Sequence, residues 1–187
     1  MNLEDRENLS IPFDRAYWVM PGKLLAGCYP GSPDPDEAIQ KQKGLLACGI
    51  GEIVNLMEPY EIDHSGNVFA GYEAPMKSLA VKMNMSISFQ RFPIKDLGIP
   101  SRKDMQHILD HIDTSIEKNK SVYVHCWGGR GRTGTVVGCY LARHGYAAGI
   151  KVLKLINRLR KVTADANLVS PETDRQRNMV IEWVEKT

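Results

Sequence analysis

The 187-residue sequence lacks several features that mark common classes of protein. No apolar run approaches the ~20 residues needed to cross a bilayer. The first ten residues, MNLEDRENLS, have neither the basic start nor the apolar stretch of a secretory signal. We therefore expect no membrane span and a cytoplasmic location. The formal net charge of +2 is too small to argue for nucleic acid as a partner.

Cysteine is scarce, and its spacing excludes further classes. Cys28, Cys48, Cys126 and Cys139 lie far apart and form no CxxC pair, which argues against a disulfide framework and against a zinc site. The histidines also lack metal-ligand spacing, so we expect no metal and no cofactor. Cys28, Cys48 and Cys139 are expected to be structural thiols, one of which could form a protective disulfide with Cys126 under oxidation. In a reducing compartment a lone cysteine stays a thiol and can act as a nucleophile.

Apolar patterning predicts alternating strands and helices. Strands are predicted over residues 23–27, 50–57, 86–92 and 121–125, and helices over residues 36–47, 101–118, 133–144 and 150–161. The alternation predicts one α/β domain spanning residues 1–187, with a central sheet of four or five strands flanked by helices.

Three further segments are less regular. Residues 1–20 are expected to be a loosely packed lead-in, anchored by Tyr17 and Trp18. Residues 58–80 show no clear periodicity, which indicates either a functional loop or a short unrecognised element. A last helix is expected to have Ser170 as its N-cap and Pro171 as its first residue.

One glycine-rich segment, HCWGGRGRTG over residues 125–134, carries the chemistry. Cys126 follows a predicted strand and precedes a predicted helix, and three glycines lie between it and Arg132. Glycines let consecutive backbone N–H groups turn toward one point, and such a nest at a helix N-terminus binds anions. Arg132 can add a bidentate grip on two phosphate oxygens. The positive surroundings favour the thiolate form of Cys126, and this combination suits covalent phosphoryl transfer.

Two nucleotide-binding patterns fit the same segment poorly. Residues 129–134 have the GxGxxG spacing, but a dinucleotide site requires an acidic residue about 20 positions later. Residues 118–161 contain no Asp or Glu. A Walker loop would need a glycine and a lysine at the positions of Cys126 and Arg132.

The segment resembles the HCxxGxxR[ST]G signature of the cysteine-based protein tyrosine and dual-specificity phosphatases. All of its positions match, namely His125, Cys126, Gly129, Arg132, Thr133 and Gly134. The lead-in YWVMPGKLLAGCYPG and the strand IVNLM also resemble the N-terminal half of compact bacterial members. The resemblance implies a dual-specificity-phosphatase-like fold and hydrolysis of a phosphate monoester through a phosphocysteine.

The resemblance also implies a role for each matching residue. Cys126 would be the nucleophile, and Arg132 would bind the substrate and stabilise the transition state. The hydroxyl of Thr133 would support the cysteine sulfur as a leaving group, and His125 would keep the loop in shape. The backbone of the loop would hold the phosphate oxygens, through Trp127, Gly128, Gly129, Arg130, Gly131 and Arg132.

The leaving group needs a proton, which this family takes from an aspartate on a mobile loop. Asp96 lies about 30 residues before Cys126, in the Pro/Gly-rich loop FPIKDLGIPS, and is the expected general acid. Asp104 and Asp110 are competitors, although the first is expected to favour a helix N-terminus and the second a solvated face. Gln176 lies where tyrosine phosphatases place a water-positioning glutamine, with a solvated helix face as an equal alternative.

The substrate is left open. A phosphorylated protein, as substrate of a tyrosine or dual-specificity phosphatase, is the first choice. An inositol phosphate or phosphoinositide is the alternative, because family members acting on inositides carry a CKxGKxR-like loop. Arg130 fills the second basic position of that loop, whereas Trp127 replaces the first. An RNA 5′-triphosphatase shares the signature, and a phosphate-binding module without catalysis is a rival from another class.

Charge is distributed unevenly along the chain. Residues 118–161 contain ten basic residues and no acidic ones. These cations are either solvated helix faces or the source of a positive field that attracts anionic substrates. A monomer is expected, although no pattern in the sequence tests this.

Overall fold

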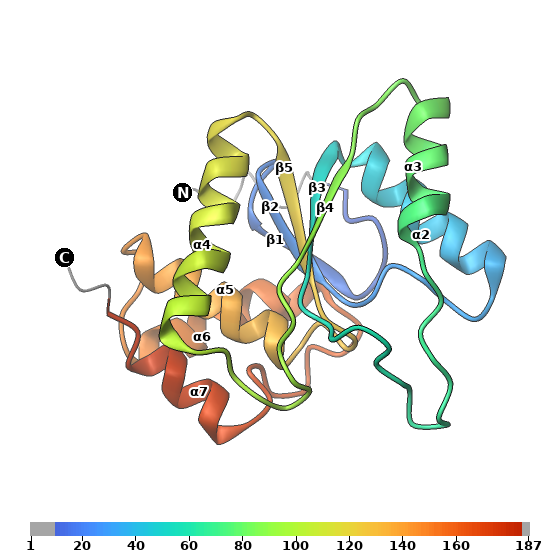
Figure 1. The fold of residues 1–187 in the computed structure, drawn as a ribbon. Coiled ribbons are helices and arrows are strands. Elements are labelled where there is room, and N and C mark those ends of the chain that lie inside the picture. Colours follow the sequence, from blue (N-terminus) through green and yellow to red (C-terminus); the bar gives the residue numbers. More distant parts are fainter. Residues whose placement is uncertain (1–9, 185–187) are drawn as a thin grey trace.

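The computed structural model describes residues 10–184, and its centre is a five-stranded sheet with the strand order β1-β2-β5-β3-β4 (Figure 1). The strands are β1 (Ala16–Met20), β2 (Leu24–Gly27), β3 (Ile50–Asn55), β4 (Ser88–Arg91) and β5 (Ser121–His125). β1 is antiparallel to β2, and the other neighbouring pairs are parallel. The carboxyl ends of the parallel strands therefore meet at one edge, where ligands bind in open α/β sheets.

Helices cover both faces of the sheet. They are α2 (Pro35–Ala47), α3 (Glu73–Lys82), α4 (Arg102–Glu117), α5 (Arg132–Arg143), α6 (Ile150–Leu159) and α7 (Asp174–Ile181), with a 3-10 turn, η1 (Arg160–Val162), after α6. α2 and α3 pack together on one side, and α4, α5, α6 and α7 pack together on the other (Figure 1). None of the helices within residues 10–184 has both the length and the apolar composition to cross a bilayer.

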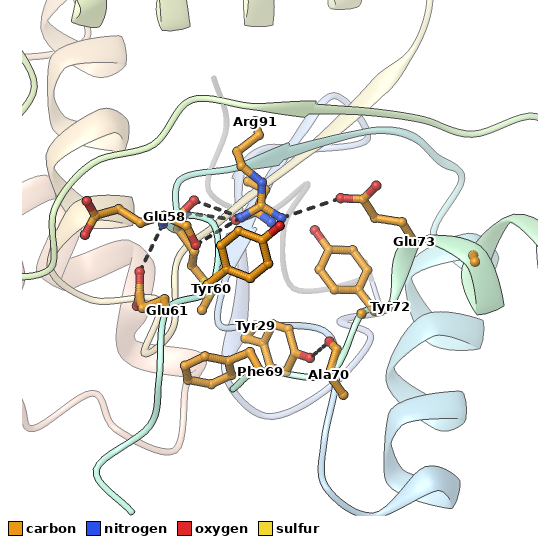
Figure 2. Close-up of a pocket in the computed structure, with 13 residues that line it drawn as sticks. Tyr29, Glu58, Tyr60, Glu61, Phe69, Ala70, Tyr72, Glu73 and Arg91 are labelled. Atoms are coloured by element: carbon orange, nitrogen blue, oxygen red, sulfur yellow. Dashed lines mark hydrogen bonds and ion pairs between the residues drawn. The ribbon is translucent and has the colours of Figure 1, made fainter. Parts of the chain in front are cut away.

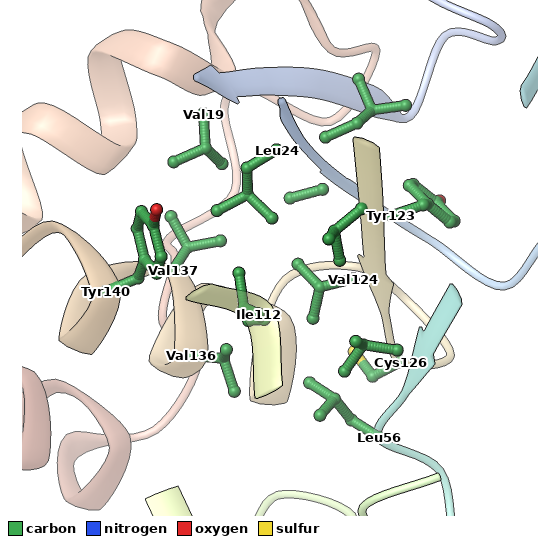
Figure 3. Packing of buried hydrophobic residues seen from close by; sticks show 14 of the residues in the cluster. Val19, Leu24, Leu56, Ile112, Tyr123, Val124, Cys126, Val136, Val137 and Tyr140 are labelled. Carbon is green, nitrogen blue, oxygen red and sulfur yellow. The ribbon is translucent and has the colours of Figure 1, made fainter. Parts of the chain in front are cut away.

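The core fixes both ends of the glycine-rich loop. Val122, Tyr123 and Val124 of β5 are completely buried, as expected for a central parallel strand with both faces covered. Val136 and Val137 of α5 pack into the same core (Figure 3). Because the strand before the loop and the helix after it are both immobilised, residues 126–131 are anchored at their two ends.

The predicted α/β class and central sheet of four or five strands are confirmed, and the sheet has five strands. Two local predictions, on the lead-in and on the start of the last helix, were wrong. Tyr17 and Trp18 are buried anchors as expected, yet they belong to β1 rather than to a loose lead-in. The pairing of this segment with β2 makes it a strand. Residues 1–9 of the predicted lead-in lie outside the described residues. The irregular segment 58–80 does contain a helix, because α3 begins at Glu73.

The last helix begins later than predicted. Its N-cap is Thr173, whose side chain and that of Gln176 form a reciprocal capping box. Ser170 and Pro171 are buried before the helix, and the hydroxyl of Ser170 donates to the carbonyl of Arg130 at 2.8 Å. The prediction failed because a Ser-Pro pair and a Thr-x-x-Gln pair compete as start signals within a few residues.

Candidate active site

The loop after β5 turns its carbonyl groups toward donors from other parts of the chain. Three carbonyls are held in this way: Trp127 by the backbone N–H of Tyr29 (2.9 Å), Gly128 by the guanidinium of Arg15 (2.8 Å) and Arg130 by the hydroxyl of Ser170 (2.8 Å). The N–H groups behave differently. Within residues 10–184, none of the backbone N–H groups of residues 127–132 donates a hydrogen bond. These donors lie at the N-terminus of α5 and are available to an anion.

Gly129 is required by a close approach of two backbones. Its φ is +73°, a conformation that favours glycine, and a Cβ there would lie 2.4 Å from the carbonyl carbon of Gly27. The loop therefore passes directly against the end of β2. This contact is the physical reason for a glycine at this point of the sequence motif.

Cys126 lies at the base of a cleft of about 610 Å³. Its side chain is buried, and Arg130, Arg132 and Asp96 line the same cleft. The structure therefore brings together a thiol, a cation and a carboxylate that are separated by up to 36 residues in the sequence, 96 to 132.

Arg132 is held by a glutamate that no sequence motif singles out. Its Nη1 and Nη2 atoms each lie 2.7 Å from an oxygen of Glu61, and Nη1 also donates to the carbonyl of Ile94 at 3.0 Å. A guanidinium has five N–H donors in a planar fork. The two without a hydrogen bond within the described residues, on Nε and Nη2, form one edge that can grip two phosphate oxygens. Asp96 faces this edge, with Oδ1 2.9 Å from Nη2.

Arg132 remains protonated although it is buried. Burial acts to lower the pKa of Arg132, but the hydrogen bonds to Glu61 and the negative charges of Cys126, Glu61 and Asp96 outweigh it. The pKa is therefore raised above its ordinary value. The guanidinium is a permanent cation beside the sulfur of Cys126.

His125 is a neutral structural residue with a defined tautomer. Its Nδ1 lies 3.1 Å from the carbonyl oxygen of Cys126, which can only accept, so Nδ1 carries the proton. Nε2 then accepts from the hydroxyl of Tyr72 at 2.7 Å. Complete burial lowers the pKa of His125 to about 3. The ring thus connects the start of the loop to the end of the 58–72 segment.

Gln176 fastens the loop that carries Asp96. Its side chain is completely buried, so the expected alternative of a solvated helix face is wrong. The amide nitrogen donates to the carbonyl of Gly98 at 3.0 Å, and the amide oxygen accepts from the N–H groups of Glu172 and Thr173. The amide of Gln176 is therefore used to join the Asp96 loop to the start of α7. The carboxylate of Asp96 itself is half-exposed.

Two other predicted site residues make contacts beyond the phosphate cradle. The hydroxyl of Thr133 is buried and donates to the carbonyl of Gly27 over a long 3.4 Å. Arg130 forms an ion pair with Glu172. Glu172 therefore supplies Arg130 with a counter-charge from within the chain.

The segment 58–72 contributes His64 to the wall of the cleft. The ring centroid of His64 lies 4.4 Å from that of the Trp127 indole. The ring centroid of Phe69 lies 5.3 Å from that of the same indole, in an edge-to-face contact. Beyond this wall is a second cavity of about 310 Å³, which contains Arg91 and Glu61 (Figure 2). Glu61 therefore lines the second cavity and contacts Arg132, which lines the cleft of Cys126. Neither Glu61 nor Arg15 carries a signal in the sequence, because each reaches the loop only through the tertiary fold.

Comparison with known proteins identifies the family. The sequence model of the Swiss Army Knife protein, DSP-PTPase phosphatase domain (PTP-SAK) matches residues 14–178. An uncharacterized protein of Methanocaldococcus jannaschii is 36% identical over 104 residues, which are 56% of this chain and 60% of that protein. The phosphatidylglycerophosphate phosphatase PTPMT2 of Arabidopsis thaliana is 35% identical over 122 residues, 65% of this chain and 45% of that protein. The chain thus spans about half of the length of these relatives.

Solved structures share the fold at low sequence identity. Tk-PTP in its active form superposes with a TM-score of 0.61 at 21% identity, covering 91% of this chain and 97% of that chain. PTPMT1 in complex with PI(5)P gives a TM-score of 0.66 at 15% identity, covering 91% and 94%. The match of the family model over residues 14–178 shows that the chain belongs to the PTP-SAK family of dual-specificity-type phosphatase domains, within the cysteine-based protein tyrosine phosphatase superfamily.

Proposed function

We propose that this domain hydrolyses phosphate monoesters through a phosphocysteine formed on Cys126. The thiolate attacks phosphorus, the bond from phosphorus to the ester oxygen breaks, and Asp96 donates a proton to that oxygen. Water then attacks the phosphocysteine and gives its proton to Asp96. The sulfur leaves as a thiolate, supported by the hydroxyl of Thr133, and inorganic phosphate is released.

This proposal rests on one observation: several N–H donors around Cys126 make no hydrogen bond within the described residues. The backbone N–H groups of residues 127–132 have no partner within the described chain. The Nε/Nη2 edge of the Arg132 guanidinium makes no hydrogen bond within the described residues and faces Asp96 in an ion pair, with Oδ1 2.9 Å from Nη2. Donors fixed in this way stabilise the charge on the phosphoryl oxygens without reorganisation. Glu61, Arg15 and Ser170 hold the guanidinium and the loop in this arrangement.

A phosphorylated protein is the first substrate class, as for dual-specificity phosphatases. The cleft supports this choice because it is open enough for a side chain and has the indole of Trp127 on its wall. A phenyl or alkyl phosphate can lie against this ring while its phosphate enters the loop.

Phosphorylated headgroups of lipids or inositols are the second class, favoured by Arg15. Arg130 and Arg132 already have carboxylate partners, whereas the nearest carboxylate to Arg15 is Asp165 at 3.9 Å. Asp165 lies closer to the buried Arg160, at 2.8 Å. Arg15 therefore offers an incompletely balanced cation at the cleft, which suits a second phosphate on the substrate. Two relatives in Arabidopsis thaliana, PTPMT2 and PTPMT1, are named as phosphatidylglycerophosphate phosphatases.

The first test is phosphate release from a small aryl phosphate in EDTA, with the reduced wild type compared with Cys126→Ser. Turnover in the wild type alone supports the reaction. A folded, reduced wild type without turnover, or equal turnover in both proteins, would overturn it. Phosphotyrosine, phosphothreonine and inositol phosphate substrates, compared by kcat/KM, then decide the class. Loss of kcat/KM in Arg15→Ala for the inositol phosphates alone would select the second class.

A further inference from the structure

The outer face of α6 carries a row of cations with no counter-charge. Lys151, Lys154 and Arg158 of α6 are exposed on one side of the helix, because they are spaced by three and four residues. The exposed Lys161 follows three residues later, in the turn η1. Within residues 10–184, none of the four has an ion pair or a hydrogen bond through its side chain. The opposite side of α6 is buried in the domain. The row is therefore a fixed array of charge on a folded scaffold.

Large apolar side chains are exposed at both ends of this row. Tyr146 and Ile150 are 39% and 56% exposed before the first lysine, and Val162, Leu168 and Val169 are 60%, 44% and 58% exposed beyond the last. Single exposed apolar residues are ordinary, but a group of them on one face marks an interaction site. We call the four cations and these five apolar residues the α6 face.

The α6 face contains two grooves, one of which shares a lining residue with the cleft of Cys126. One groove is lined by Tyr146, Lys151 and Lys154, and the other by Lys154 and Leu168 among others; Arg158 lines both. Neither groove has an acidic residue in its lining. Leu168 also lines the cleft that contains Cys126. A flat partner on the α6 face would therefore reach the rim of the cleft.

The chemistry of the face distinguishes between anionic partners. A single-stranded nucleic acid would match the cations, but it is usually also held by aromatic rings that stack on its bases, and Tyr146 is the one aromatic among the nine residues of the face. An anionic lipid surface matches both parts of the face. Its headgroups can contact the cations, and the boundary with the acyl chains can take up the exposed aliphatic side chains.

We infer that the α6 face docks this domain on an anionic lipid surface and sets the mouth of the cleft beside the headgroups. The inference concerns where the domain binds and does not depend on the proposed reaction. Each Lys or Arg near an anionic membrane contributes about 1 kcal/mol. Removing two of the four cations should therefore weaken binding about 30-fold.

The test measures co-sedimentation of the full chain with vesicles of phosphatidylcholine and phosphatidylglycerol, which contain no phosphate monoester. Lys154→Ala combined with Arg158→Ala should weaken binding about 30-fold. The matched control combines Lys82→Ala with Lys103→Ala, which removes two exposed lysines from α3 and α4 and should change binding less than about twofold.

Two further measurements separate the apolar and ionic contributions. Ile150→Ser combined with Val169→Ser should weaken vesicle binding about tenfold, because both side chains lose apolar burial. Raising the salt from about 0.1 M to about 1 M, which shortens the Debye length from ~10 Å to ~3 Å, should weaken it as well. Circular dichroism and thermal melting show whether each variant is folded. Cys126→Ser should bind vesicles like the wild type, so this test is separate from that of catalysis.

Three outcomes would overturn the inference. One is equal binding to vesicles of phosphatidylcholine alone. Another is vesicle binding that the α6 variants and the control variant alter equally, or no vesicle binding by the folded wild type. The third is binding to a single-stranded RNA oligonucleotide without binding to vesicles. If the RNA affinity falls in the Lys154/Arg158 variant and not in the Ile150/Val169 variant, the face binds nucleic acid.

Discussion

Replacing Glu61 by Gln tests whether the glutamate positions Arg132. Both side chains are largely buried, with 10% and 2% of their surface exposed, and two 2.7 Å contacts join them. A glutamine has one acceptor oxygen, and its NH₂ group would face an N–H donor of the guanidinium. The substitution therefore removes one hydrogen bond, introduces a donor–donor contact and leaves the cation without its main counter-charge.

The expected loss of stability follows from the burial of the pair. Removing one member of a buried ion pair destabilises a protein by about 3–5 kcal/mol. Arg132 retains Asp96 at 2.9 Å and the carbonyl of Ile94 at 3.0 Å, so we expect the lower value, about 3 kcal/mol. For a domain of this size the midpoint of thermal unfolding should then fall by roughly 6–12 °C.

The kcat/KM should fall as well, because Glu61 would no longer orient the Nε/Nη2 edge of Arg132 toward the substrate phosphate. Urea unfolding and kcat/KM for an aryl phosphate, measured below the melting temperature, check both effects. Glu58→Gln is the matched control, since Glu58 lies in the same segment with an exposed side chain. If Glu61→Gln unfolds within about 0.5 kcal/mol of the wild type and keeps the kcat/KM of the control, Glu61 does not position Arg132.

Two other predictions concern the acid and the buried histidine. Asp96→Asn should lower kcat about 10²- to 10⁴-fold, as expected when a general acid is lost. An unchanged kcat, together with a full pre-steady-state burst of the released leaving group, would exclude Asp96 from that role. His125 titrates near 6.5 when unfolded and about 3 when folded, so the unfolded state takes up the proton first as pH falls. Urea unfolding of the wild type should therefore show about 2 kcal/mol less stability at about pH 5 than at about pH 7, relative to the change in His125→Gln. The same pH dependence in both proteins would contradict the burial argument.

The sequence predicted the parts of the site that depend on neighbours along the chain. The strand, the glycine turn and the helix around Cys126 and Arg132 all show local patterns. Asp96 could be singled out as a candidate because it lies in a Pro/Gly-rich loop that is recognisable in the sequence, and the structure places it in the cleft of Cys126. Glu61 and Arg15 could not, since they contact the loop across 71 and 113 residues and lie in segments without a motif.

Two errors in the fold have the same kind of cause. β1 was missed because its segment becomes a strand by pairing with β2, and its apolar residues alone do not specify that pairing. The start of α7 was misplaced because Ser170 resembles an N-cap, whereas its hydroxyl is used by the carbonyl of Arg130. Thr173 and Gln176 carry the correct signal, a Thr-x-x-Gln capping box, three residues later.

The glycine-rich loop separates two properties that usually go together, stiffness and protection of amide hydrogens. Its carbonyls are tied to Tyr29, Arg15 and Ser170, so the backbone is held in place. Its N–H groups have no acceptor within the described chain. Their hydrogens can therefore exchange with water without local unfolding. Isotope exchange at residues 127–132 should therefore be fast in an empty, rigid loop. The same amides become slow when an oxyanion occupies the site, which makes them an internal reporter of occupancy.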